Sequence, residues 1–237
     1  MLTKEQDEVI VLSKTDKGEA DRVFTVLAQY EGKINLFAKG ERKILSKLRR
    51  AMDLFYLTRA TFIESPVRIT LTDVTLLDGF PALRHNWRKF QVAGWISDLL
   101  NSVLPLKVKD EEIFLLTKES LEDLNQATES FQRYYYYFFW RFLKVLGYQP
   151  EMGFTKSFSE KIFISSSRGI IKSKTGESRL INPEVKFLIQ SIFQGEKESF
   201  YRQDISLSSQ KNLTETSSLY FDFLALTKDS HSFDFKL

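Results

Sequence analysis

The chain has no cysteine among its 237 residues. This absence excludes a disulfide scaffold, zinc or iron–sulfur sites built on thiolates, and a cysteine nucleophile. Histidine is almost as scarce. His85 and His231 are too far apart in sequence to suggest a local metal site, so we expect them at the surface or at helix caps.

Long hydrophobic runs are also missing. No segment approaches the roughly 18 apolar residues of a membrane span, and the opening stretch MLTKEQDE contains no apolar leader. Hydrophobic residues make up 43% of the chain and charged residues 27%, which is ordinary for a folded soluble protein. We expect a cytoplasmic protein with no membrane partner.

Motifs that mark catalytic sites are absent from the sequence as well. There is no phosphate-cradling Gly-x-x-x-x-Gly-Lys pattern and no nucleophile elbow. The carboxylates show no pattern that marks a general acid and base. We therefore expect a protein that acts by binding rather than by catalysis, with no cofactor.

The first eighty residues contain five runs typical of β-strands. Glycine and proline separate them, at Gly18, Gly32, Gly40 and Pro66. The runs lie at 8–13, 22–30, 33–38, 55–63 and 67–76. Five short strands in so few residues predict a small closed sheet such as an OB-type barrel, which often carries a short helix between its third and fourth strands. Residues 47–52 are the candidate for that helix.

The remainder of the chain has helical spacing, so the predicted class is α+β. Helices are expected at 87–104, from Asp110 onward, at 130–146, from Asn182 to near Gly195, and at 208–227. The aromatic run 134–140 is expected in the core, since a base-stacking surface would need exposed rings. We place an OB domain at 1–78 and a helical domain at 79–237, with a small loop or hairpin module at 152–181.

A cluster of positive charge lies between the third and fourth predicted strands. Residues 39–50 contain six cations and one anion, a local charge of +5, whereas the whole chain carries +3, so the rest sums to −2. Such a cluster indicates a surface that contacts phosphate. Two alternatives remain open: a merely solvated charged face, and a surface of a protein–protein adaptor that binds an acidic partner.

Ordered short motifs carry a resemblance to a known family. They are GEADR at 18–22, GKI at 32–34, AKG at 38–40, LRRA at 48–51, FPALR at 80–84, WRFL at 140–143 and LGYQPE at 146–151. Their succession resembles the RecO family of bacterial recombination and repair proteins over about the first 150 residues.

The resemblance implies an OB fold followed by a helical domain, and a function without covalent chemistry. RecO proteins bind single- and double-stranded DNA, anneal complementary strands and, with RecR, help load RecA onto DNA coated by single-stranded-DNA-binding protein. A nucleoid-associated location in the cytoplasm follows. The residues expected to contact DNA are Arg22, Lys33, Lys39, Arg42, Lys43, Lys47, Arg49 and Arg50.

A second partner site is expected on the helix at 130–146. RecO proteins engage the acidic C-terminal tail of single-stranded-DNA-binding protein, and such a tail needs an apolar slot beside cations. The residues expected to hold it are Arg133, Arg141, Phe142 and Lys144. The alternative is that these cations only extend from a buried helix into water.

The chain departs from the family pattern in one module. Many RecO relatives carry two Cys-x-x-Cys pairs that bind zinc, but the corresponding positions here, near Thr155, Phe158, Lys172 and Thr175, hold no thiol. We therefore predict a metal-free module that is held by apolar packing. The packing residues are Phe154, Phe158, Ile162, Phe163, Ile170 and Ile171.

Overall fold

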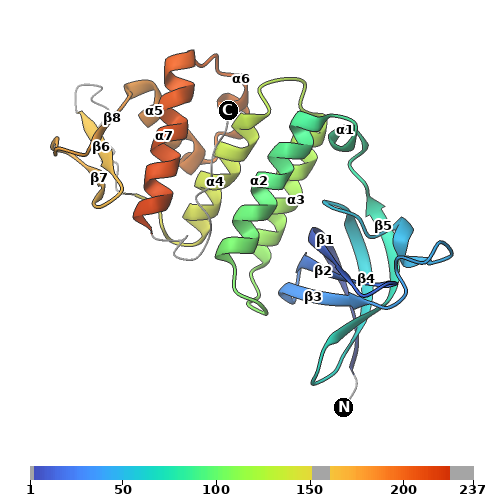
Figure 1. Ribbon diagram of the computed structural model, residues 1–237. Helices are drawn as coiled ribbons and strands as arrows, with labels where there is room; N and C mark the ends of the chain where they lie inside the picture. Colours follow the sequence, from blue (N-terminus) through green and yellow to red (C-terminus); the bar gives the residue numbers. More distant parts are fainter. Residues whose placement is uncertain (1–2, 151–160, 225–237) are drawn as a thin grey trace. The chain divides into compact units, whose positions relative to one another are not determined.

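The computed structural model describes residues 3–150 and 161–224 (Figure 1). The chain forms two compact units, Met1–Tyr135 and Tyr136–Leu237. The first holds a β-barrel and the helices that follow it. The second holds a helical cluster and a small sheet. The domain boundary that we expect after residue 78 stays a prediction.

A closed five-stranded barrel forms the start of the first unit. Its strands are β1 (Thr3–Lys17), β2 (Asp21–Ala28), β3 (Gly32–Ala38), β4 (Leu57–Glu64) and β5 (Ile69–Asp78). Their order around the barrel is β1-β2-β3-β5-β4, and the β1–β4 pairing closes it. All pairs are antiparallel except β3 and β5, which run parallel through Leu36 and Ile69. The predicted OB-type barrel is confirmed.

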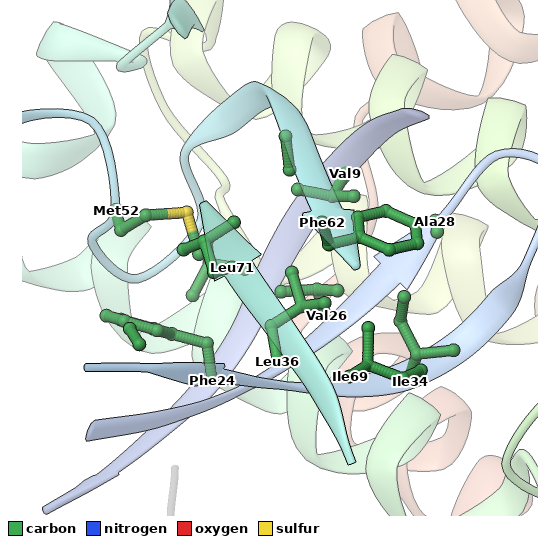
Figure 2. Packing of buried hydrophobic residues seen from close by; sticks show 13 residues of the cluster. Val9, Phe24, Val26, Ala28, Ile34, Leu36, Met52, Phe62, Ile69 and Leu71 are labelled. Atoms are coloured by element: carbon green, nitrogen blue, oxygen red, sulfur yellow. The ribbon is translucent and has the colours of Figure 1, made fainter. Parts of the chain in front are cut away.

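Alternating apolar side chains fill the barrel interior (Figure 2). On β2 and β3 every second residue points inward, as a half-buried strand requires. Met52, which follows the third strand by fourteen positions, closes the core from the connecting segment and is 1% exposed. The interior residues are Val9, Val11, Phe24, Val26, Ala28, Ile34, Leu36, Ala38, Met52, Ala60, Phe62, Ile69 and Leu71.

Strand β1 is buried on both faces, which explains its continuous apolar run. Val9 and Val11 point into the barrel, while Ile10 and Leu12 are 0% and 4% exposed on the other face. Helix α2 (Trp87–Val103) contacts that outer face, and the Ser97 hydroxyl donates a hydrogen bond to the Leu12 carbonyl oxygen at 2.7 Å. The helix and the barrel therefore share β1.

Three helices complete the first unit: α1 (Pro81–Arg84), α2 and α3 (Glu111–Gln126). The Asn86 side chain caps α2 by accepting from the backbone N–H groups of Arg88 and Lys89. The predicted Asp110 cap of α3 is confirmed, since its carboxylate accepts from the Ile113 backbone N–H at 3.1 Å. These caps satisfy helix-end donors that would otherwise lack partners.

Helix α4 (Gln132–Val145) carries the aromatic run into the second unit. The run is buried from Tyr135 to Trp140, as predicted, with Trp140 at 0% exposure. The Trp140 indole N–H donates to Ser217 Oγ at 3.2 Å, and its ring stacks on Tyr220 with centroids 5.3 Å apart. Both partners lie on α7 (Leu207–Phe223), so α4 and α7 pack through this aromatic group.

The predicted hairpin is present within a three-stranded sheet. Strands β6 (Ile162–Ser165) and β7 (Gly169–Ile171) form it, and β8 (Arg179–Ile181) adds a strand that the sequence did not indicate. Helices α5 (Pro183–Gln194), α6 (Lys197–Arg202) and α7 follow. Ile162 is buried and the exposure of Phe163, Ile170 and Ile171 is intermediate. Phe154 and Phe158 lie outside the described residues.

Candidate nucleic-acid interface

The segment between β3 and β4 forms a turn-rich loop on the barrel. We call residues 39–50 the basic loop. Consecutive turns join the Lys43 N–H to the Gly40 carbonyl oxygen (3.1 Å) and the Ser46 N–H to the Lys43 carbonyl oxygen (3.0 Å). The predicted short helix is a single 3₁₀ turn, η1 (Leu48–Arg50). The loop leaves the body of the barrel after β3 and returns toward the start of β4 (Figure 1).

All six cations of the basic loop are exposed. Arg42 is compensated in part, since its guanidinium lies 3.5 Å from Asp16 and donates to the Gly18 carbonyl oxygen. The other five form no ion pair with any described residue: they are Lys39, Lys43, Lys47, Arg49 and Arg50. Five uncompensated charges on one loop produce a local positive potential that attracts polyanions.

A buried ion pair fixes the base of the loop. Glu41, the only anion of the loop, is 0% exposed and lies 3.1 Å from the Arg22 guanidinium on β2. Arg22 also pairs with Asp16 on β1 at 2.8 Å, and the hydrogen bond from Arg22 lowers the pKa of Asp16. The Arg42 N–H donates to the Ala20 carbonyl oxygen at 3.0 Å. The loop is thus tied to the β1–β2 hairpin.

Two residues of the expected DNA-binding set interact with other residues of the first unit instead of facing the solvent beside the basic loop. Arg22 faces two carboxylates, so its charge is compensated where it lies. Lys33 is 7% exposed, its ammonium donates to the Asn101 carbonyl oxygen at 2.7 Å, and burial lowers its pKa. Both residues join elements of the first unit to one another. We therefore leave Arg22 and Lys33 out of the proposed phosphate surface.

One cation that the sequence analysis did not select belongs beside the basic loop. Lys17 is exposed at the end of β1 and has no ion pair among the described residues. It pairs in register with Asp21, one position from the Arg22–Ala38 pair that precedes the loop. A single lysine at the end of a strand carries no sequence pattern that would predict its proximity to the basic loop.

The residues of the expected partner-tail site differ in their accessibility. Phe142 is 0% exposed and stacks on Phe138, so it presents no surface to a peptide. Lys144 is exposed, and its ammonium donates to the Phe193 carbonyl oxygen at 2.7 Å. Arg133 and Arg141 are half-buried on α4. The Phe142 ring therefore belongs to the aromatic core, and a tail site that includes Phe142 stays a prediction.

Within residues 3–150 and 161–224, no three His, Asp or Glu side chains come together as ligands for a metal ion. None of the helices described there is both long and apolar enough to cross a lipid bilayer.

Comparison with known proteins agrees with this arrangement. A family model described as "Recombination protein O N terminal" matches residues 1–79, and one described as "Recombination protein O C terminal" matches residues 84–223. The first match covers the barrel and the basic loop. The second covers the helices and the small sheet.

Curated relatives have the same family name. A "DNA repair protein RecO" from Thermodesulfovibrio yellowstonii is 31% identical over 178 residues, which cover 72% of this chain and 70% of the relative. One from Caldanaerobacter subterraneus is 25% identical over 191 residues, 77% of each chain. One from Acetivibrio thermocellus is 21% identical over 223 residues, 87% of this chain and 89% of the relative. The chain therefore belongs to the RecO family, whose function is DNA repair and recombination.

Proposed function

We propose that this chain is a non-enzymatic recombination mediator that binds single- and double-stranded DNA through phosphate contacts of the basic loop. The observation that carries the proposal is the set of five exposed, uncompensated cations on a loop that a buried ion pair anchors. Contacts to phosphate depend on charge and carry no base information, so binding to all sequences should be similar.

Annealing of complementary strands would follow from the same charges. Cations that neutralise phosphate on two strands reduce the repulsion between them. If all five cations contact phosphate, the logarithm of affinity should fall against the logarithm of salt concentration with a slope of about −3.5 for single strands and −4.5 for duplex.

The test replaces Lys43, Lys47 and Arg49 together by alanine. Binding to single strands and to duplex should weaken, the salt slope should flatten by roughly 2.1 to 2.7, and annealing measured without nucleoside triphosphate should fall in parallel. Thermal stability should change little, because exposed charges contribute little to folding. A triple variant with wild-type affinity and wild-type salt slope would refute the proposal.

A matched control separates local contact from overall charge. Lys161, Arg168 and Lys174 are exposed in the second unit and pair with no described residue. Replacing them by alanine also removes two lysines and one arginine, as in the test variant, but leaves the basic loop unchanged. This control should keep the wild-type salt slope. Strong binding to an acidic peptide without DNA affinity would instead favour the protein–protein adaptor.

The family membership supports the partner proteins of the proposal. We propose that the chain acts in the cytoplasm at the nucleoid, together with RecR, to load RecA onto DNA coated by single-stranded-DNA-binding protein. For the acidic tail of that protein, Arg141 and Lys144 on the C-terminal half of α4 are the candidate contacts. Replacing both by glutamate should abolish binding of the tail peptide, and unchanged peptide affinity in a folded variant would refute this placement.

A further inference from the structure

Two aliphatic side chains lie fully in water at the tip of the basic loop. Ile44 is 88% exposed and Leu45 is 94% exposed, and Lys43 and Lys47 flank them in sequence. Single exposed hydrophobic residues are normal on protein surfaces. Two adjacent ones, both almost fully exposed and set between uncompensated cations, form a small apolar surface within a positively charged one.

The loop is anchored on both sides of this pair. On the N-terminal side, buried Glu41 pairs with Arg22 at 3.1 Å. On the C-terminal side, Ala51 and Met52 are 7% and 1% exposed, and Met52 belongs to the barrel core (Figure 2). With both ends fixed, Ile44 and Leu45 cannot reach the barrel core without breaking these contacts. Their exposure follows from the way the loop is attached.

We propose that Ile44 and Leu45 pack against the faces of unstacked bases in single-stranded DNA while Lys43 and Lys47 contact its phosphates. This inference rests on the proposed DNA-binding function and extends it from phosphate to base. The face of a base is flat and apolar, and a single strand presents it where a duplex hides it in the stack. Leucine and isoleucine make such contacts when they insert between bases.

Charge complementarity selects the occupant. A neutral apolar partner would gain nothing from the five cations around the pair, whereas a single strand supplies phosphates and apolar faces at the same time. The contact uses base faces rather than base edges, so it tolerates any sequence. It therefore gives a preference for single strands over duplex without sequence specificity.

The experiment compares three ligands of equal length: a mixed-sequence single strand, an abasic strand with the same phosphates, and a duplex. The variant Ile44→Ser with Leu45→Ser should lose roughly ten-fold affinity for the base-bearing strand, because the two apolar side chains no longer cover the base faces. Its affinity for the abasic strand and for duplex should stay near the wild-type value. Its salt slope should be unchanged, because no charge is removed.

Val67 provides the matched control. It is 90% exposed in the β4–β5 turn, at the end of the barrel where β4 pairs with the start of β1, away from the β1–β2 hairpin. Val67→Ser also removes exposed aliphatic surface, and it should leave all three affinities at the wild-type value.

The outcomes separate this inference from the proposed function. An unchanged affinity of the Ile44/Leu45 variant for the base-bearing strand, or an equal loss on the abasic strand, would overturn base contact. If base contact were overturned in this way and the Lys43/Lys47/Arg49 variant nevertheless lost DNA affinity, the proposed phosphate contacts would hold without the base contacts. Loss of binding to vesicles of phosphatidylglycerol and phosphatidylcholine, with DNA affinity unchanged, would also overturn base contact and identify a membrane-surface loop.

Discussion

Replacing Gly32 by alanine tests a close backbone approach in the first unit. Gly32 begins β3 with φ +67°, and an added Cβ would lie 2.1 Å from the Val108 carbonyl oxygen and 2.6 Å from its carbonyl carbon. No Cβ tolerates such distances, so the segment after α2 would have to move. That segment is held to β3, since the Lys107 N–H donates to the Lys33 carbonyl oxygen at 2.8 Å.

The magnitude follows from two separate costs. Alanine at a positive φ costs about 1 to 2 kcal/mol. Moving the segment after α2 removes the Lys107–Lys33 bond, and it strains the bond from the buried Lys33 ammonium to Asn101 as well. Losing those hydrogen bonds costs about 1 to 3 kcal/mol more. We therefore expect Gly32→Ala to lower the free energy of unfolding by about 2 to 5 kcal/mol.

Gly18→Ala is the matched control. Gly18 has φ +62° in the β1–β2 turn, but an added Cβ would meet nothing within 4 Å. This variant should lose only the free energy that the backbone conformation costs alanine, about 1 to 2 kcal/mol. Urea unfolding of both variants measures the difference in the free energy of unfolding, and an unchanged slope m confirms that each variant still unfolds in two states. Equal losses of stability in the two variants would refute the close approach as the cause.

Three further predictions concern burial and metal content. Burial raises the pKa of Asp7 above its ordinary value of 3.8, so the folded state loses stability as the pH rises from that value through the folded-state pKa. Asp7→Asn removes this titration, so urea unfolding should show the variant gaining stability relative to the wild type over the same pH range. A loss of stability relative to the wild type over that range would contradict the prediction. Ser97→Ala removes the bond to the Leu12 carbonyl oxygen and should cost about 1 to 3 kcal/mol, whereas an unchanged Tm would show that the bond contributes nothing. Elemental analysis should find no stoichiometric zinc and a chelator should leave Tm unchanged; one tightly held zinc per chain would disprove the metal-free module.

Local patterns predicted most of the fold. Alternation of apolar residues and glycine-containing turns located the five strands, and capping residues such as Asp110 located helix starts. Both ends of β1 were missed, because residues 3–7 and 14–17 are mostly polar and form a strand only by pairing with β4 and β2. Strand β8 was missed for the same reason, since three residues become a strand only beside β6.

The candidate site was predictable where it depends on local charge and unpredictable where it depends on distant partners. The basic loop is a contiguous cluster, so its cations could be read from the sequence. Arg22 and Lys33 carry the same charge, but their partners Glu41 and Asn101 lie 19 and 68 positions away. Phe142 could have been placed in the core, because it follows Phe138 by one helical turn and stacks on it.

The shared position of β1 determines how the first unit comes apart. Ile10 and Leu12 face α2, while Val9 and Val11 face the barrel interior. Separating α2 from the barrel, or opening the barrel, would therefore expose apolar residues of β1 to water in either case. The barrel and α2 should therefore unfold in one transition and exchange their most protected amides at the same rate. A fragment cut after Asp78 would leave Ile10 and Leu12 uncovered and would be prone to associate through them. Fragments made to isolate the basic loop should extend through α3, to Gln126 or beyond.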